Sequence, residues 1–386
     1  MKSKVVHIVL NTFVQDSRVM RECKSLAENG YDVTVIAYWM KGLKEKEHQN
    51  GYTVNRLQLI SKTWVNNSIV QLFKYIEFLF KAILTIKIIK PQICHGHDPN
   101  GLLAAYLAKV LWDCKLIYDS HELWSDSIHS KGKKKFLYKI GREFEKLLIK
   151  KADAVITVNQ SIADIMLHEN KIPSINIVRN MPSKSKNSSI LSKAELGFPK
   201  CKFNLIYTGN VEKGRGVNAT IEAFKSVRPD VGFIIMGRDS SYRNKMKEKV
   251  NTLKLGQRIK FIKAVLPYEV VNVCKLAEAG IAPIKNMCKS YYLSLPNKIF
   301  EYIQAGMPVL SSDFPEMKRI IDEYNIGLTF DVEDATNISK LINALFDNDK
   351  IYNIFCDNSK KAAESLNWNV EQSKLIDLYQ QLIEAK

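Results

Sequence analysis

The stretch SLPNKIFEYIQAGMPVLSSD, from Ser294 to Asp313, contains a helix start signal, a helical middle and a stop signal. Pro296 predicts the start of a helix, because proline there lacks only an N–H group that would have no partner anyway. Gly306 can adopt the left-handed conformation that ends a helix, and Pro308 cannot continue one. The apolar residues that follow predict a buried strand. We therefore expect a loop, a short helix and a strand.

Two charged residues, Lys298 and Glu301, lie near the start of this helix. A helix N-terminus already favours anions, so a cation there can help bind a phosphate, and a nearby carboxylate can accept hydrogen bonds from two hydroxyls. The pair suits a phosphorylated sugar. On this stretch alone, a capped surface helix with an incidental ion pair remains the alternative.

The chain has 386 residues, which favours two domains of roughly 150 to 200 residues each. Short apolar strands alternate with helical patterns, first from KVVHIVLN onward and again from FNLIYTGN onward. This alternation predicts an α/β fold with two facing Rossmann-like, doubly wound domains and a ligand cleft lined by the loops after the strands. The predicted segments are a first domain (1–182), a linker (183–200), a second domain (201–365) and a C-terminal helix (366–386) that could cross back to the first domain.

The net charge of +17 is concentrated in the first half, where residues 1–200 hold 31 Lys and Arg against 18 Asp and Glu. Such a field attracts a membrane surface, a pyrophosphate-bearing substrate or nucleic acid, although a generic solvated surface is also possible. The seven cysteines form no C-x-x-C pair, which argues against a disulfide framework or a cysteine zinc site. The N-terminal stretch has no cleavage signal, so we expect a cytoplasmic protein.

A glycine-rich loop, GNVEKGRG, follows the strand FNLIYT. It is not a P-loop, because Arg215 and Gly216 stand where Lys and Ser or Thr would be required, and it lacks the G-x-G-x-x-G dinucleotide fingerprint. What remains is a strand-to-helix turn whose backbone can approach a phosphate, with Lys213 and Arg215 supplying charge. A plain flexible turn is the alternative.

Polar residues also end three strands of the first half, where the cleft is expected: HGHDPN (His95 to Asn100), YDSHEL (Tyr118 to Leu123) and NTFVQDSRVM. His121 could donate a hydrogen bond to a sugar hydroxyl or a phosphate oxygen, although a structural histidine is an equal alternative. Asp16 or Ser17 is a candidate helix N-cap, followed by Arg18, which could simply pair with a neighbouring carboxylate. The Asp-Asn-Asp sequence at 347–349 lies between two helical patterns and is expected to cap a helix. We therefore expect no divalent-metal site and no cofactor.

Several of these motifs together resemble the bacterial retaining glycosyltransferases of family 4, which have two Rossmann-like domains in the GT-B arrangement. The resemblance rests on SLPNKIFEYIQAGMPVL, YTGN with KGRG, DSRVMRECKSLAENGYDVTVI and YDSHEL, and their order matches over nearly the whole chain. It implies that Glu301 holds the donor ribose, that Arg215 and Lys298 face the diphosphate, and that His121 lies near the transferred sugar. The expected catalytic residues are His121, Arg215 and Lys298. The expected substrate-binding residues are Glu301, Asn297, Ser294, Gly209, Asn210, Lys213, Gly237, Asp16, Arg18, His97 and Asp98.

The sequence departs from the family pattern at three places. Leu293 stands where members often carry a first glutamate, so backbone amides near Ser294 are expected to replace its contact. Asn210 stands where an arginine is common, and Lys213 is expected to compensate. The usual Gly-Gly after the first strand is replaced by FVQDSRV.

The resemblance implies a metal-independent, retaining glycosyltransferase of the hexosyltransferase type. It would move a sugar from a nucleotide diphosphate donor to a glycan or lipid-linked acceptor in surface polysaccharide synthesis, without a covalent intermediate. One alternative is a nucleotide-sugar 2-epimerase of the same fold. Another is a basic nucleic-acid-binding protein, which would need basic and aromatic residues interleaved on one surface.

Two segments bear on membrane binding. The stretch Ile69 to Lys90 has too many charges to span a bilayer, and we expect it to be mainly a core helix. The stretch Ser130 to Lys151 carries nine Lys and Arg against two glutamates. A basic amphipathic segment of this kind predicts reversible, peripheral binding at the inner face of the cytoplasmic membrane, weakened by changing Lys133, Lys134 and Lys135 to glutamate.

Overall fold

The computed structural model describes residues 2–14, 16–64, 67–126, 135–184 and 192–384, with only the backbone described for Thr63, Ser68, Ser125 and 135–140. The chain divides into two compact units. Residues 1–179 and 372–386 form the first unit, and residues 180–371 form the second. The predicted linker 183–200 therefore falls in the second unit, and its residues 185–191 lie outside the described residues.

In the described part of the first unit, eight strands form one sheet in the order β3-β4-β2-β1-β5-β6-β7-β8. Neighbouring strands are parallel except for β3 and β4, which form a hairpin. The strands are β1 (Lys4–Ile8), β2 (Asp32–Tyr38), β3 (Lys46–Gln49), β4 (Tyr52–Leu57), β5 (Ile93–His97), β6 (Lys115–Ser120), β7 (Ala154–Thr157) and β8 (Asn176–Ile177). The helices are α1 (Ser17–Glu28), η1 (Ile60–Thr63), α2 (Ser68–Ile89), α3 (Asp98–Trp112), η2 (Trp124–Asp126), α4 (Lys135–Ile149), α5 (Gln160–Asn170) and most of α14 (Trp368–Glu384).

The described part of the second unit has six strands, all parallel, in the order β11-β10-β9-β12-β13-β14. The strands are β9 (Phe203–Thr208), β10 (Val231–Gly237), β11 (Ile259–Lys263), β12 (Ala279–Ala282), β13 (Val309–Ser312) and β14 (Gly327–Phe330). The helices are α6 (Val217–Ala223), α7 (Ser241–Thr252), α8 (Val270–Cys274), α9 (Lys289–Tyr292), α10 (Asn297–Ala305), α11 (Pro315–Tyr324), α12 (Ala335–Asp347) and α13 (Asp349–Ser365).

Both sheets grow outward in two directions from their first strand, as in the Rossmann fold. Ligands of such sheets bind beyond the carboxyl ends of the strands where the order reverses, which is between β1 and β5 in the first unit and between β9 and β12 in the second. The predicted fold class, two Rossmann-like α/β domains, is confirmed.

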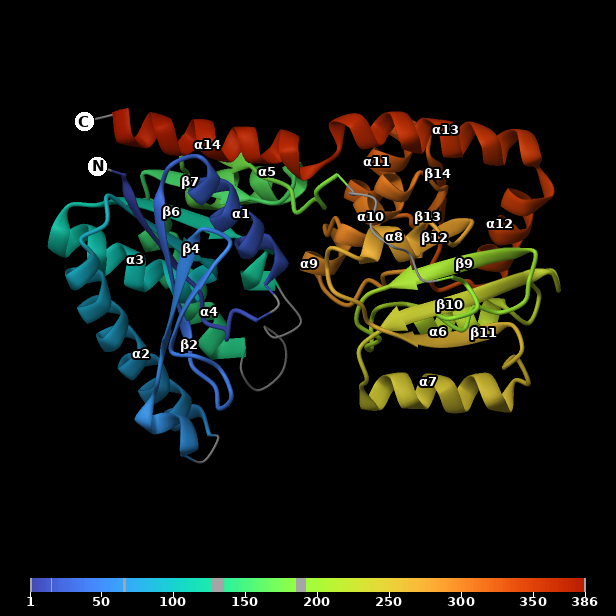
Figure 1. Ribbon diagram of the computed structural model, residues 1–386, viewed down its shortest axis with the longest axis horizontal. Coiled ribbons are helices and arrows are strands. Elements are labelled where there is room, and N and C mark those ends of the chain that lie inside the picture. The colour runs from blue at the N-terminus through green and yellow to red at the C-terminus, as the bar shows by residue number, and fades with distance from the viewer. Residues whose placement is uncertain (1, 15, 65–66, 127–134, 185–191, 385–386) are drawn as a thin grey trace. The chain divides into compact units, whose positions relative to one another are not determined.

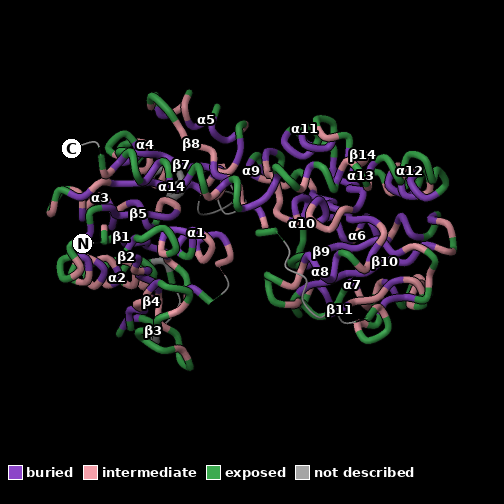
Figure 2. Tube along the Cα trace, turned by 45° about the horizontal axis from the view of Figure 1, so that its top comes forward, coloured by how far each residue is buried: buried purple, intermediate pink, exposed green. Residues whose placement is uncertain are grey.

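The inner strands of the second sheet, β10, β9, β12 and β13, are buried almost throughout, so both faces of the sheet are covered there. In β9, Leu205 and Tyr207 belong to one buried cluster with the apolar face of α7, whereas Ile206 belongs to another with α10. Accordingly, α7 and α10 lie on opposite sides of the sheet (Figure 1). Buried residues follow the strands in both units, and exposed residues gather at turns and outer helix faces (Figure 2).

The segment from Ser294 to Asp313 folds as predicted, into a loop, a short helix and a strand. Pro296 is the N-cap of α10, and Gly306 ends the helix with a φ of 73°. The strand β13 follows directly. The ring of Tyr302 packs on Gly280 of β12, where a Cβ atom would lie 2.2 Å from the ring, so a glycine is needed for α10 to approach the sheet.

The predicted core helix α2 buries only a narrow stripe in the described residues, formed by Phe78, Ala82 and Ile86. Seven of its large apolar side chains are exposed: Ile69, Leu72, Phe73, Ile76, Phe80, Leu84 and Ile88. No helix in the described ranges is long and apolar enough to cross a membrane.

Candidate functional site

In the second unit, the loop from Gly209 to Gly216 follows β9 at the point where the strand order reverses. Gly216 has a φ of 67°, and a Cβ atom there would lie 1.7 Å from the carbonyl oxygen of Pro283, just after β12. A Cβ atom on Gly237 would lie 2.3 Å from the carbonyl oxygen of Gly209. Both contacts are possible only for glycine, so these residues let the loop lie against the ends of the neighbouring strands.

Lys298, from the first turn of α10, extends toward this loop and is only 8% exposed. Its Nζ atom lies 3.6 Å from the ring centroid of Tyr207. A Cβ atom added to Gly209 would also lie 3.6 Å from Nζ, so the ammonium is directly beside the loop. Among the described residues it forms no hydrogen bond or ion pair. Burial and the nearby charge of Arg215 hold the pKa of this ammonium well below its usual value, although Glu301 acts in the opposite direction. The site is thus short of negative charge.

Glu301 follows Lys298 by three residues, on the same side of the helix. Its Oε2 atom accepts a hydrogen bond of 2.7 Å from the hydroxyl of Thr208, the last residue of β9. The backbone N–H of Thr208 donates to the hydroxyl of Tyr302, which donates in turn to the carbonyl of Ile281. These bonds fix the start of α10 against β9 and β12, so the carboxylate is held at the carboxyl end of the sheet.

The other predicted donor residues lie around the same loop. The guanidinium of Arg215 stacks on the ring of Tyr291 at 4.8 Å. Asn210 and Lys213 are exposed, and the carbonyl of Asn210 accepts a hydrogen bond from the hydroxyl of Tyr207. Asn297 is the first residue of α10. The structure therefore brings the residues predicted for the second unit to one place.

The loop before α10 differs from the expectation at Ser294. Its backbone N–H donates to the carbonyl of Tyr291, and its hydroxyl donates to the same oxygen. The N–H of Leu293 is likewise bonded, to the carbonyl of Lys289. The amides expected to replace the missing glutamate are thus already used inside the turn, because α9 ends there and its last N–H groups bond back to it.

In the first unit, His121 follows β6 and lies between two carboxylates. Its Nε2 atom is 3.2 Å from Oδ2 of Asp119, and its Nδ1 atom is 3.6 Å from Oδ2 of Asp98. Burial alone would lower the pKa of His121, but Asp98 and Asp119 raise it to about 10. His121 is 23% exposed, so an imidazolium that can donate hydrogen bonds is available at the surface of the first unit.

Arg18 lies in the first turn of α1, whose N-cap is Asp16 as predicted. Its guanidinium is 3% exposed and donates to both oxygens of Asp119, at 3.0 and 2.9 Å, and to the carbonyl of Val178 at 2.7 Å. Although burial opposes the charge of Asp119, Arg18 and His121 hold its pKa well below the usual range. Arg18 therefore pairs with a carboxylate, which was the alternative from the sequence, and its direct contact with a substrate stays a prediction.

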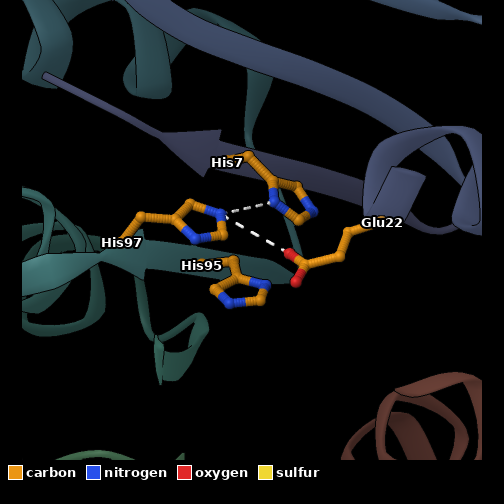
Figure 3. Close-up of side chains that lie close together, drawn as sticks. All are labelled: His7, Glu22, His95 and His97. Atoms are coloured by element: carbon orange, nitrogen blue, oxygen red, sulfur yellow. Dashed lines mark hydrogen bonds and ion pairs between the residues drawn. The ribbon is translucent and has the colours of Figure 1, made fainter. Parts of the chain in front are cut away.

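His97, also expected at the substrate, is only 3% exposed and belongs to a buried cluster with His7, His95 and Glu22 (Figure 3). His7 and His95 are paired residues of the neighbouring strands β1 and β5, and Glu22 comes from the buried face of α1. Glu22 and His7 were not predicted, and His95 was noted only as part of the polar segment His95 to Asn100, with no role of its own. The signal for them was present, since histidines inside apolar strands are unusual, but only the parallel pairing of β1 with β5 brings them together.

Comparison with known proteins identifies the family. Residues 16–181 match the model of Glycosyltransferase Family 4, and residues 189–362 match that of Glycosyl transferases group 1. The chain is a GT-B glycosyltransferase. The two matches follow one another along the chain and lie largely within the first and second units, respectively.

This glycosyltransferase is 23% identical over 302 residues to the uncharacterized glycosyltransferase MJ1069 of Methanocaldococcus jannaschii, covering 74% of this chain and 73% of that protein. Its fold is similar to that of sucrose-phosphate synthase from Thermosynechococcus elongatus, with a TM-score of 0.82, 16% identity and full coverage of both chains. It is also similar to HepE from Anabaena in complex with UDP-glucose, with a TM-score of 0.76, 13% identity, and 98% and 99% coverage of the two chains. These structural likenesses extend over both units and show the shared fold.

Proposed function

We propose that this glycosyltransferase uses a nucleoside diphosphate sugar and transfers the sugar, with retention at the anomeric carbon, to a hydroxyl of a glycan or lipid-linked acceptor in surface polysaccharide synthesis. One observation carries the donor assignment. The ammonium of Lys298 is buried beside Arg215 without an ion pair among the described residues. A diphosphate supplies the negative charge that this site lacks. The bound UDP-glucose of HepE, a protein of the same fold, supports the same donor class.

The residues of the second unit would divide the donor between them. Lys298 and Arg215 stabilise the diphosphate, on which charge develops as the sugar departs. Glu301 accepts hydrogen bonds from the ribose hydroxyls, held in place by Thr208. Because the protein supplies its own cations at the leaving group, the reaction proceeds without a divalent ion there.

His121 of the first unit would act on the transferred sugar. Its imidazolium, maintained by Asp98 and Asp119, donates a hydrogen bond to a sugar or phosphate oxygen as the glycosidic bond lengthens. In the proposed front-face route the leaving diphosphate accepts the proton of the acceptor hydroxyl on the same face of the sugar. No protein nucleophile is then required, and catalysis consists of positioning and charge stabilisation.

We further propose peripheral binding of the first unit to an anionic membrane surface. The exposed apolar side chains of α2 support this, together with the basic charge of residues 1–200. Lys133 and Lys134, named from the sequence for this role, lie outside the described residues, as does the side chain of Lys135. A test on α2 is therefore more direct.

The test of function is a reaction of the purified chain with nucleoside diphosphate sugars. Proton NMR of the product with a lipid-linked or oligosaccharide acceptor reads the anomeric configuration, which should match that of the donor. The same incubation without acceptor addresses the 2-epimerase alternative, because only an epimerase returns an isomerised donor. An inverted product would refute retention, and an isomerised donor would refute transfer as the main activity.

A further inference from the structure

The buried cluster of the first unit has the arrangement of a metal-ligand set. His7 on β1, His95 and His97 on β5 and Glu22 on α1 each offer one ligand atom, and the four atoms lie within 4.8 Å of one another. Figure 3 shows the rings of His7 and His97 and the carboxylate of Glu22 turned toward a common point, with the ring of His95 beside them. All four residues are buried, with exposures between 0 and 3%.

Two of the distances between these atoms bracket the separation of ligands around one ion. Nδ1 of His7 lies 2.9 Å from Nε2 of His97, which lies 3.9 Å from Oε2 of Glu22. Ligands about 2.0–2.1 Å from a tetrahedral ion are separated by roughly 3.3–3.5 Å, which lies between these two values. Small side-chain movements would therefore complete the shell.

The cluster also contains buried polar atoms that the described protein does not satisfy. Nε2 of His95 has no hydrogen-bond partner there, and neither carboxylate oxygen of Glu22 accepts a well-formed hydrogen bond, although Arg18 Nε lies 3.1 Å from Oε1. Leaving such atoms unsatisfied in a protein interior costs free energy, so each is a place where a ligand is expected.

The outward nitrogen of each histidine, by contrast, has a partner. Nδ1 of His95 and Nε2 of His7 lie 2.6 and 3.3 Å from the hydroxyl of Tyr379. Nδ1 of His97 lies 3.1 Å from Nε2 of His121 and 3.4 Å from Oδ2 of Asp119. Histidine ligands of metals are normally oriented in this way, with one nitrogen on the ion and the other held by a hydroxyl, carbonyl or carboxylate.

We propose that His7, Glu22, His95 and His97 bind a divalent transition-metal ion of the zinc class inside the first unit. Three imidazoles and one carboxylate suit zinc, iron, cobalt or nickel better than magnesium or calcium, which prefer oxygen. The closed site indicates a structural ion rather than a catalytic one.

The ion would hold β1, β5 and α1 together and, through His97, orient the Asp119 and His121 pair. From the sequence we expected no divalent-metal site, because no metal-binding motif is recognisable there, and the proposed site reverses that expectation. The proposed site does not depend on the proposed transfer reaction. The ligands belong to the first unit, whereas the proposed diphosphate contacts belong to the second.

The test is metal analysis of the full chain without an affinity tag, expressed in defined medium with zinc or with cobalt and then desalted. We expect about one metal ion per chain by mass spectrometry of the elements, and a visible absorption band for the cobalt form. Glu22→Gln and His95→Gln should lower bound metal at least about tenfold, whereas His168→Gln, an exposed histidine on α5, should not. Tyr379→Phe should keep the ligands but weaken affinity about tenfold to a hundredfold.

Zinc should also raise the melting temperature of the wild-type chain above that of protein made in zinc-depleted medium, and the difference should vanish in Glu22→Gln. A wild-type chain that holds less than about a tenth of an equivalent after growth with either metal would overturn the proposal. So would Glu22→Gln and His95→Gln proteins that keep the wild-type metal content. Because cobalt absorption and metal content are measured on the wild-type chain, the result stands even where a variant folds poorly.

Discussion

Replacing Lys298 with methionine should weaken donor binding and stabilise the protein at the same time. The ammonium lies beneath the loop of Gly209 with the ring of Tyr207 beside it, and among the described residues it forms no hydrogen bond or ion pair. A structural lysine in such a place would be difficult to explain, because burying an unpaired charge is unfavourable. A methionine fills similar space without the charge.

The magnitudes follow from the surroundings of the ammonium. A lost charge-assisted hydrogen bond to a phosphate costs about 1.5–3 kcal/mol, which is roughly a tenfold to a hundredfold rise in Kd. Removal of the unpaired charge should raise the free energy of unfolding by about 0.5–2 kcal/mol, as other substitutions that relieve a functional strain do. This gain corresponds to a few degrees in Tm.

The pH dependence has a defined sign. Burial and Arg215 lower the pKa of Lys298 in the free protein, and a bound diphosphate would raise it again. At a pH between the pKa of Lys298 in the free protein and its pKa in the complex, binding takes up a proton. The affinity of the wild type should therefore fall as the pH rises through this range, and the methionine variant should lose this dependence. Since the folded pKa is also below the unfolded one, the stability gain of the variant should be largest at pH below the folded pKa.

Calorimetric titration with uridine and guanosine diphosphates across pH, together with thermal unfolding, measures all three effects. Lys318→Met is the matched control, since Lys318 is half exposed on α11 of the same unit and forms only surface ion pairs. A Lys298→Met protein that binds the diphosphates as the wild type does, or that is destabilised, would refute the donor site.

Further outcomes are expected at the other sites. Glu301→Ala should reduce donor use about tenfold to a hundredfold while the protein stays folded, and wild-type turnover in this variant would contradict the ribose contact. EDTA added only for the time of the assay, too short to extract an ion from the buried histidine cluster, should leave transfer intact, whereas strict dependence on added manganese would show that a divalent ion acts at the diphosphate. His121→Ala should lower kcat more than donor affinity, because its contact strengthens as the sugar departs; an unchanged kcat would make it structural. Anionic vesicles should sediment the protein at low salt, and less so after Phe73→Ser with Phe80→Ser; the same binding after that change would exclude α2.

The residues at its two ends were enough to predict the helix α10. A proline, a glycine and a second proline determined its two ends, and each acts through the backbone of its own residue or its neighbour. The hairpin of β3 and β4 had an equally local signal that was not used. Asn50 and Gly51, with φ values of 49° and 84°, form the turn between the two strands, as an Asn-Gly pair does in short hairpins.

Contacts between distant elements were beyond this reasoning. Thr208 and Tyr207 complete the surroundings of Glu301 and Lys298, but they are about ninety residues away. The sequence placed them in an apolar strand and in the YTGN motif without predicting either contact. Tyr379, whose hydroxyl lies at hydrogen-bond distance from His95, is 284 positions further along the chain than this histidine. It reaches the first unit because α14 returns to that unit. Spacing in the sequence carries no information on such pairs, since they depend on strand order.

The two units have the same exception to ordinary core chemistry at the same point of the fold. Lys298 lies at the reversal of strand order beside β9 and β12, and the cluster around Glu22 lies at the reversal between β1 and β5. Elsewhere on β1, β5, β9 and β12 the buried side chains are mainly apolar, so Lys298 and the Glu22 cluster lie where Rossmann-like sheets bind ligands. An uncompensated buried charge lowers stability in the free protein and is retained where a bound group of opposite charge restores the balance. On this argument an anion would balance the charge of Lys298, whereas a metal ion would satisfy the unpartnered atoms of Glu22, which already pairs with Arg18, and of His95. Each expectation can be tested in its own unit without the other.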